Sequence, residues 1–164
     1  MLIYNPRQMA LVTCKGKHLL MGKSTEKHDI VPTTWHSPAS SHPPMYSIFL
    51  ENSTMACKLI TQSGAFVVNF MPNSQVESVK KAQGISGEYT EKIEHLGLHE
   101  LPCEKLVDSF RIKEAVGWLE CELVEEKSLG DHTLFVGRVV HSWMERDEKR
   151  VFHVEGNEFT TTLR

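Results

Sequence analysis

The sequence predicts a mostly β protein, an antiparallel barrel with a few short helices inserted between its strands. Short apolar or alternating stretches typical of strands recur along the chain and are separated by turn signals. Few stretches have helical spacing, and they do not alternate regularly with the strands as the helices of a parallel sheet do. The chain has 164 residues, 40% of them apolar, so we expect a single domain over residues 1–164 with a substantial core.

The first third of the chain is predicted to consist of strands. The apolar run Met9–Cys14 is followed by a turn signal at Gly16–Lys17, and we expect His18–Gly22 to pair back as a hairpin. Asp29–Trp35 is predicted as a third strand. Its Pro32 confines it to a sheet edge or a bulge, because proline has no N–H to donate to a central ladder.

The stretch from Thr33 to Pro44, TTWHSPASSHPP, is predicted to be extended or looped. Its last two prolines disfavour the helical conformation of the residues before them, His42 and Pro43. A loop rich in hydroxyl groups with an exposed aromatic side chain suits ligand binding, and it is also an ordinary connection. Met45–Glu51 follows as a strand buried on one face and partly on the other.

A helix is predicted over residues 52–64. Asn52 or Ser53 can cap its first amides, apolar residues recur at i,i+4 spacing, and the final glycine supplies a left-handed stop. Ala65–Pro72 is then a near-continuous apolar strand interrupted only by Asn69. This asparagine is explained equally well as a strand-end amide satisfied by the backbone and as a ligand contact.

Two shorter helices follow in the middle of the chain. Residues 73–84 are predicted to form a helix that begins with a capping box of Ser74 and Glu77 and ends at a glycine. A further short helix is expected at about residues 87–97. Residues 98–112 are irregular or short-stranded.

The last third of the chain returns to strands. Gly117–Trp143 gives the strongest hairpin signal in the sequence, with alternating apolar and acidic residues before a turn at Gly130–Asp131. Residues 150–162 add one more strand-like stretch around Gly156.

Composition and charge exclude several classes of protein. The formal net charge is -3, and no run of Lys or Arg is longer than two residues, whereas a nucleic-acid-binding protein would show a basic patch. The first residues lack the charged start and apolar run of a signal peptide, and no stretch has the roughly eighteen apolar residues of a membrane span. We therefore expect a cytoplasmic protein with no nucleic-acid or membrane partner.

The cysteines and histidines form no redox or metal motif. Cys14, Cys57, Cys103 and Cys121 are widely spaced, so we expect all four to be reduced, with Cys57 and Cys121 as small buried apolar residues. No His-x-x-x-His pair lies on a predicted helix, and we expect no metal. The fingerprints G-x-G-x-x-G, G-x-x-x-x-G-K-[ST] and G-x-S-x-G are missing, which disfavours a Rossmann or P-loop enzyme.

One candidate anion site remains at the start of the helix predicted over residues 52–64. The first turn presents free amides and the positive end of the helix dipole, Ser53 and Thr54 carry hydroxyl groups, and Lys58 lies one turn further along. Such a set suits a phosphate group. From these residues alone, an ordinary helix cap with a solvated lysine explains the pattern better.

Five segments occur in a characteristic order: VTCKGK, IVPTTWHSPASSHPPMYSIFL, NSTMACKLITQSGAFVVNF, WLECELVEEKSLGDHTLFVGRVV and FHVEGNEFTT. In this order and spacing they resemble the flavin reductase-like family, the FMN-binding split barrels, and in particular its flavoredoxin branch. The resemblance covers almost the whole chain. It implies a six-stranded antiparallel Greek-key barrel with helices at its openings, working as a homodimer with FMN near the subunit interface.

The resemblance also implies which residues bind the flavin. They are Thr33, Thr34, Trp35, His36, Ser37, Pro38, Ser53, Thr54, Lys58, Asn69 and His132. The stretch from Thr33 to Pro38 would run along the flavin, with its threonines near the ribityl and phosphate end and Trp35, His36 and Ser37 lining the ring. The helix start would hold the phosphate, and Asn69 would end its strand beside the flavin.

Two residues leave alternatives open. The counterpart of His132 lies on the ligand side in many relatives, yet this residue is equally well explained as a turn histidine bonded to Asp131. Relatives often carry asparagine where Asp29 stands. Because a carboxylate repels a phosphate, either Asp29 points away from the ligand or the loop differs.

The resemblance implies an FMN-dependent oxidoreductase that passes hydride or electrons from NAD(P)H or a protein donor through bound FMN. The cofactor carries this chemistry while the protein sets its position and solvent access, so no catalytic acid or base is required. The alternative is a non-enzymatic FMN-binding electron carrier or sensor, reduced by a redox protein partner such as a ferredoxin or hydrogenase system. A third class, a ligand-binding barrel with no flavin, remains because fold does not fix function.

Overall fold

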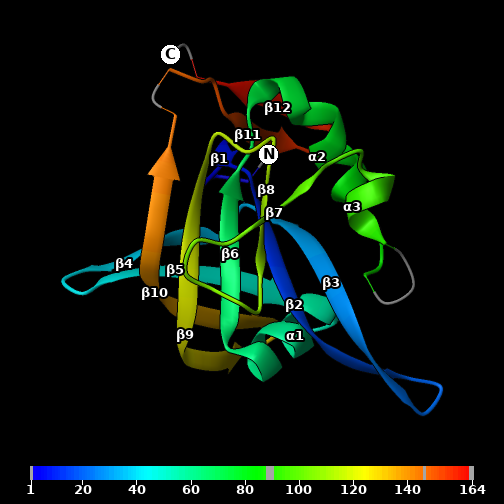
Figure 1. Cartoon of the computed structure of the whole chain (residues 1–164). Helices are drawn as coiled ribbons and strands as arrows, with labels where there is room; N and C mark the ends of the chain where they lie inside the picture. The colour runs from blue at the N-terminus through cyan, green and yellow to red at the C-terminus, as the bar shows by residue number, and fades with distance from the viewer. Residues whose placement is uncertain (1, 88–90, 146, 163–164) are drawn as a thin grey trace.

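An antiparallel β-barrel forms the body of the molecule, with short helices at its ends (Figure 1). The computed structural model describes residues 2–87, 91–145 and 147–162. The strands are β1 (Arg7–Gln8), β2 (Ala10–Leu20), β3 (Lys23–Thr33), β4 (His36–Ser41), β5 (Pro44–Glu51), β6 (Ala65–Phe70), β7 (Glu100–Pro102), β8 (Phe110–Ile112), β9 (Gly117–Leu129), β10 (His132–Met144), β11 (Val151–Glu155) and β12 (Glu158–Thr161). The helices are α1 (Met55–Ser63), the 3-10 turn η1 (Asn73–Gln75), α2 (Val76–Ala82) and α3 (Lys92–His95). The predicted mostly β fold class is confirmed.

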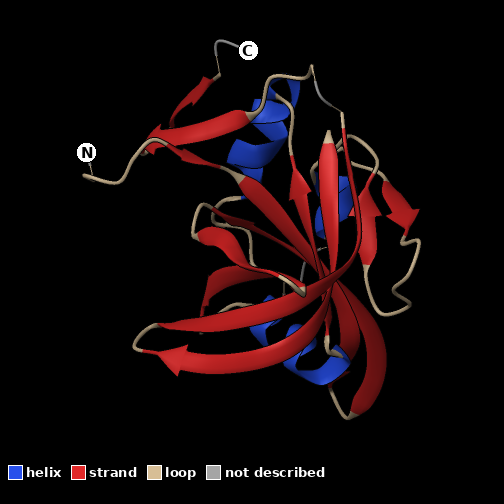
Figure 2. Cartoon of the chain, turned by 90° about the vertical axis from the view of Figure 1, so that its left-hand side faces the viewer, coloured by secondary structure: helices blue, strands red, loops and turns tan. Residues whose placement is uncertain are grey.

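The main sheet closes on itself because its two edge strands are neighbours in the chain. The strand order is β3-β2-β6-β9-β10-β5-β4, and only Thr34 and Trp35 separate β3 from β4. Across this seam the Phe49 N–H donates to the Trp35 carbonyl over 2.9 Å, and the Thr33 hydroxyl donates to the Phe49 carbonyl over 3.2 Å. Figure 2 shows the strands curving around one another.

The main sheet has seven strands where the resemblance implied six. The chain bends at Thr34–Trp35, so a stretch that pairs first with β2 and then with β5 is divided into β3 and β4. The connection from β5 through α1 carries the chain across one end of the barrel to β6, which lies between β2 and β9. This crossing gives the expected Greek-key order.

Both faces of β6 and of the first half of β2, Ala10–Cys14, are covered, which explains their near-continuous apolar sequences. Alternate residues of β2, such as Ala10 and Val12, join the cluster that α1 closes at one end of the barrel. The residues between them, such as Leu11, join a second cluster with α2, β8 and β11. Successive side chains of a strand point to opposite faces. Because both faces of β6 are covered, every one of its residues is buried.

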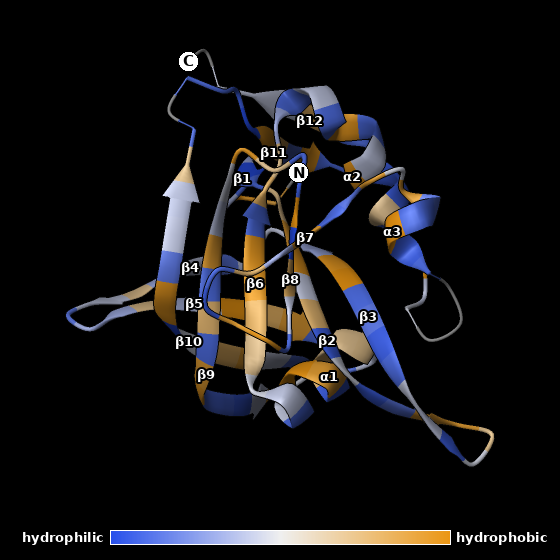
Figure 3. Ribbon diagram, in the orientation of Figure 1, coloured by the Kyte–Doolittle hydropathy of each residue, from blue (hydrophilic) through white to orange (hydrophobic). Residues whose placement is uncertain are grey.

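The first hairpin turn is not at Gly16–Lys17 as predicted. β2 and β3 continue past it as a long arm and turn at Met21–Gly22, where both residues have positive φ, as a two-residue I′ turn requires. A Cβ on Gly16 would lie 3.0 Å from a Leu59 methyl group and 2.9 Å from the Gln62 side chain, so this glycine permits close packing of α1 on β2. Figure 3 shows the apolar tip of the arm, which contains the exposed Met21.

The helix starts differ from the predicted caps. Thr54, not Asn52 or Ser53, is the N-cap of α1, and its side chain makes no cap hydrogen bond to the first turn. Asn52 instead ties the start of this segment to the β9–β10 hairpin: its Nδ2 donates to the Gly130 carbonyl, and its Oδ1 accepts from the Thr133 hydroxyl. The predicted glycine stop is confirmed, with Gly64 at φ 70°.

The second helix also begins without its predicted capping box. Residues 73–75 form a 3-10 turn, α2 begins at Val76, and no side-chain cap bond is present. Glu77 pairs instead with Lys80, one turn along its own helix. The following predicted helix is shorter than expected, since α3 covers only Lys92–His95; residues 88–90 of the predicted range lie outside the described residues.

The last third of the chain forms one long hairpin of the main sheet and most of a separate small sheet. The predicted turn at Gly130–Asp131 is confirmed, with Leu129 and His132 paired on either side. The predicted single strand around Gly156 is two strands, β11 and β12, which form a separate sheet with β1. Pro32 lies on the edge strand β3, as predicted.

All four cysteines are free, and no helix in the described ranges has the length and apolar character needed to span a membrane.

Candidate functional site

A cavity of about 700 Å³ lies at the seam of the barrel. Its walls come from the end of β3 and the bend that follows, from the end of β5 and the start of α1, and from residues 82–87. Six of the predicted flavin-binding residues line it: Thr33, Thr34, Trp35, Ser53, Thr54 and His132. Ligand cavities in proteins range from about 300 to 1,000 Å³, so its size suits a small organic ligand.

Trp35 and His132 form an aromatic wall of this cavity. Their rings stack with centroids 4.5 Å apart and planes 18° apart, and Trp35 is 40% exposed. The His132 Nδ1 lies 2.6 Å from the Asp131 carboxylate, which can only accept, so Nδ1 carries the proton. This contact holds the pKa of Asp131 below its usual value. His132 therefore combines the two roles that the sequence left open, a turn contact and a place on the cavity wall.

Thr33 serves the barrel seam as well as the cavity. Its hydroxyl donates to the Phe49 carbonyl and accepts from the Trp35 N–H over 3.0 Å. These contacts fix the bend that presents Trp35. The next residue, Thr34, has its carbonyl bound by the Arg7 guanidinium over 2.7 Å.

His36, Ser37 and Pro38 lie on the other side of Trp35, along β4, and do not line the larger cavity. The His36 Nε2 lies 2.9 Å from the Gln8 carbonyl, so this nitrogen carries the proton and Nδ1 accepts from the Tyr46 hydroxyl over 2.8 Å. Burial lowers the pKa of His36 and raises that of Tyr46 to about 12. The neutral imidazole holds β4 to β1 and β5.

The start of α1 forms part of the cavity wall. Ser53 and Thr54 line the wall, and the Thr54 hydroxyl donates to the Glu51 carbonyl over 2.9 Å. Because the side chain of the N-cap residue Thr54 makes no bond to the first turn, the first-turn amides are available to an anion. Lys58 is exposed one turn along the helix and is not part of the wall, whereas Glu51 is.

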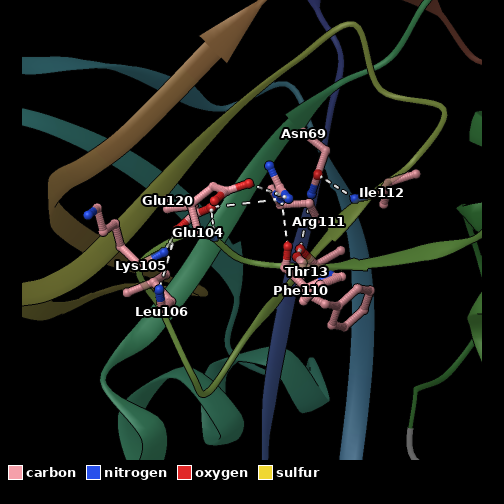
Figure 4. Close-up of polar contacts among 10 residues, drawn as sticks. Thr13, Asn69, Glu104, Lys105, Leu106, Phe110, Arg111, Ile112 and Glu120 are labelled. Atoms are coloured by element: carbon pink, nitrogen blue, oxygen red, sulfur yellow. Dashed lines mark hydrogen bonds and ion pairs between the residues drawn. The ribbon is translucent and has the colours of Figure 1, made fainter.

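Asn69 lies in a buried polar network on the outer face of the barrel (Figure 4). Its Nδ2 donates to the Leu11 carbonyl and the Thr13 hydroxyl, each over 3.0 Å, and its Oδ1 accepts from the Ile112 N–H over 2.9 Å. These bonds attach β8 to β2 and β6. The Asn69 amide group therefore has a structural role, and Asn69 is not part of the cavity wall.

A second part of the same network holds the segment before β8. The Glu120 carboxylate is fully buried and accepts from three successive backbone N–H groups, those of Glu104, Lys105 and Leu106 (Figure 4). The Arg111 Nε lies 3.8 Å from it. Nothing in the alternating pattern of β9 distinguished this buried glutamate from its exposed neighbours.

The wall formed by residues 82–87 was not predicted from the sequence. Gly87 packs directly on Asp29, leaving no room for a Cβ. Asp29 is buried, and its carboxylate lies 2.9 Å from the Lys92 ammonium of α3. The carboxylate is thus paired and is not part of the cavity wall, which agrees with the alternative that Asp29 points away from a ligand in this cavity. The glycines at 84 and 87 were the only sequence signal for this loop.

Comparison with known proteins agrees with the fold. The family model described as "Flavin reductase like domain" matches residues 3–160. An uncharacterized protein of Archaeoglobus fulgidus is 34% identical over 122 residues, which are 74% of this chain and 68% of that protein.

Two solved structures have a similar fold. One is the FMN-binding protein from Thermus thermophilus with bound p-hydroxybenzaldehyde, with a TM-score of 0.83 and 22% identity over 98% of this chain and 89% of that one. The other is the flavoredoxin of Desulfovibrio vulgaris (Miyazaki F), with a TM-score of 0.83 and 23% identity over 100% of this chain and 90% of that one. With the family match over nearly the whole chain, the protein belongs to the flavin reductase-like domain family.

Proposed function

We propose that this protein is an FMN-binding oxidoreductase of the flavin reductase or flavoredoxin type. The observation that carries the proposal is the cavity of about 700 Å³ that joins the uncapped start of α1 to the exposed Trp35 ring. FMN has a planar ring at one end and a phosphate at the other. An aromatic wall and a helix N-terminus suit these two ends, so the residues present fit the cofactor.

The phosphate is assigned to the start of α1. The first-turn amides and the Ser53 hydroxyl donate to it, and Lys58, four residues beyond the N-cap, adds positive charge from the helix surface. Glu51 opposes this attraction because its carboxylate lies on the same wall. The balance of these charges sets how strongly the site prefers a phosphorylated flavin.

The ring is assigned to the wall of Trp35 and His132. When bound, FMN supplies the hydride and electron transfer chemistry. The chain's own residues orient the ring and restrict its access to water. Asp131 fixes the proton of His132 on Nδ1, which leaves Nε2 able to accept a hydrogen bond from the ligand.

The electron donor is proposed to be NAD(P)H. The chain lacks a dinucleotide fingerprint, which fits a nicotinamide that contacts the flavin only transiently. The same observation fits the second candidate, a non-enzymatic electron carrier or sensor reduced by a redox protein partner.

Two measurements test the proposed function. The purified protein is expected to be yellow or to take up added FMN; absence of FMN binding would refute both candidates. Anaerobic mixing of the FMN-loaded protein with NADH or NADPH is expected to bleach the flavin absorbance within seconds. A flavin that stays oxidised with both nucleotides would reject the enzyme and favour the carrier.

A further inference from the structure

One wall of the large cavity is a loop that lies outside the barrel strands. Residues 82–87 run from the last residue of α2 and line this wall. Ala82, at one end, is buried in the apolar cluster that α2 shares with β8 and β11. Gly87, at the other end, lies against the buried Asp29 of β3. The position of the wall therefore depends on what holds Gly87.

Gly87 is required for space and not for backbone conformation. Its φ is outside the left-handed region that favours glycine. A Cβ added to it would lie 2.6 Å from the Asp29 Oδ2 and still closer to the Cγ of the same carboxyl group. These atoms belong to a buried side chain with no solvent to move into. The Gly87 backbone therefore packs directly on the Asp29 carboxylate.

Asp29 is held in turn by Lys92 of α3. The Lys92 Nζ lies 2.9 Å from the Asp29 Oδ1 and donates to the Ile30 carbonyl over 2.8 Å. The Ile30 N–H donates to the same Oδ1 over 2.8 Å, while Oδ2 is buried without a hydrogen-bond partner among the described residues. The Lys92 side chain is 4% exposed and that of Asp29 1%. Without Lys92 the carboxylate would lack its buried counter-ion, which is strongly unfavourable.

A second ion pair beside the first has the opposite polarity. Lys27 precedes Asp29 by two residues on β3, so the two side chains point to the same face of the strand. The Lys27 Nζ lies 3.1 Å from the Glu91 Oε1, next to the Lys92 that pairs with Asp29. Exchanging the two partners would place like charges together. Such pairs can fix an arrangement even where they add little net stability.

We propose that Asp29 and Lys92 are positioning residues for the large cavity. Their ion pair fixes the surface on which Gly87 packs, and Gly87 in turn fixes the wall formed by residues 82–87. Neither charged side chain lines the cavity, so both act through the wall. The inference rests on the proposed function for the identity of the ligand, FMN, but the position of the wall is measurable without a ligand.

Lys92→Met tests the ion pair, and Arg111→Met is its matched control. Arg111 is also buried, and its Nε lies 3.8 Å from the fully buried Glu120 carboxylate, but it is not part of the cavity wall. We expect Lys92→Met to bind FMN at least about tenfold more weakly than the native chain, and Arg111→Met to bind it within about threefold of the native affinity. Hydrogen exchange of the flavin-free proteins, followed by mass spectrometry, measures the wall itself. The amides of residues 82–87 are expected to exchange roughly tenfold faster in Lys92→Met and at the native rate in Arg111→Met.

Gly87→Ala displaces the wall without changing any charge. In the native chain we expect it to weaken FMN binding and to speed the exchange of residues 82–87. In Asp29→Ala, which lacks the atoms that the new Cβ would meet, Gly87→Ala is expected to have no further effect on either measurement. This loss of additivity would not arise if the added methyl group acted by entering the cavity. If Lys92→Met does not fold, Gly87→Ala, which keeps both charges, decides.

The outcomes separate this inference from the proposed function. Native exchange rates in Lys92→Met and Gly87→Ala would overturn the inference, as would equal losses of FMN affinity in Lys92→Met and Arg111→Met. Faster exchange with native FMN affinity would overturn the role of the wall in the site. An effect of Gly87→Ala as large in Asp29→Ala as in the native chain would also overturn it. A native chain that binds no FMN would refute the proposed function, and the exchange rates would still decide whether the ion pair fixes the wall.

Discussion

His36 is a buried neutral imidazole whose environment makes the protein's stability depend on pH. Burial lowers its pKa from 6.5, so between the folded pKa and about 6.5 the unfolded chain binds more protons than the folded one. The free energy of unfolding is therefore expected to fall as the pH drops below about 6.5. Urea unfolding at several pH values measures this slope. His36→Gln, which retains a side-chain donor for the Gln8 carbonyl, is expected to have a shallower slope; an unchanged slope would contradict the assignment to His36.

Asn69 is predicted to act in stability and not in flavin binding. Asn69→Leu leaves the buried Ile112 N–H without its side-chain acceptor and removes two donated bonds, so we expect it to cost about 2–4 kcal/mol of unfolding free energy. The FMN dissociation constant, measured well below the melting temperature, is expected to change less than about threefold. Weakened FMN binding with little loss of stability would restore the ligand role implied by the resemblance.

Lys58 and Glu51 are predicted to change the preference for FMN over riboflavin in opposite directions. Lys58→Ala removes a positive charge near the start of α1, and we expect the FMN-to-riboflavin affinity ratio to fall by roughly threefold to tenfold, because an exposed charge is screened by solvent. Glu51→Gln removes a carboxylate from the cavity wall and is expected to raise the ratio. Calorimetric titration of both flavins into the three proteins measures the effect. An FMN-to-riboflavin affinity ratio that is unchanged in both variants would show that the phosphate binds elsewhere.

At the scale of elements, Gly137 in β10 is predicted to be required for close packing inside the barrel. A Cβ there would lie 2.6 Å from the Cys121 Cβ and 2.8 Å from the Phe66 ring, and both neighbours are fully buried. Gly137→Ala is expected to cost about 1–3 kcal/mol of stability by overpacking. Arg138→Ala, at the next and exposed position, is the control and is expected to change stability by less than about 0.5 kcal/mol. Equal unfolding midpoints would contradict this packing.

The sequence predicted elements well where one local signal was sufficient. The β9–β10 hairpin turns at Gly130–Asp131 as expected, since a turn signal there separates two long alternating runs. The turn predicted at Gly16 was wrong because the role of this glycine depends on tertiary packing. A residue without a side chain is needed there for α1 to pack closely on β2, not for a turn. The predicted cap of α1 was wrong for a related reason. The Asn52 side chain bonds the β9–β10 hairpin instead of the first turn of α1.

At the scale of the whole molecule, the exposed apolar surface around Trp35 predicts self-association. Ile3 is 99% exposed, Leu2 56% and Tyr4 44%, and the Tyr4 ring meets the half-exposed Trp35 ring edge to face. We expect a twofold homodimer that covers this surface and the flavin ring. Light scattering at micromolar concentration is expected to give twice the chain mass, and Ile3→Glu to shift the mass towards that of one chain. A monomer that still binds FMN would refute the dimer.

The candidate site was predictable in part, because its residues come from distant segments. Trp35 and the start of α1 were found from the sequence and face one cavity. The resemblance implied that His36 lines the flavin ring, but in the structure its side chain points towards Gln8 and Tyr46 and does not line the larger cavity. The wall formed by residues 82–87 depends on contacts between distant segments, which no local sequence pattern predicts.

The cavity between Trp35 and the start of α1 is proposed to bind FMN. Equilibrium dialysis of FMN against the native chain, Ser53→Trp and Ser24→Trp tests this assignment. Ser53 lines the cavity and is exposed, whereas Ser24 is exposed near the tip of the β2–β3 arm. We expect one FMN per chain for the native protein and Ser24→Trp, and at least about tenfold weaker binding for Ser53→Trp, because the introduced indole fills the phosphate end of the cavity. FMN binding of equal strength in all three proteins, or none in the native chain, would contradict it.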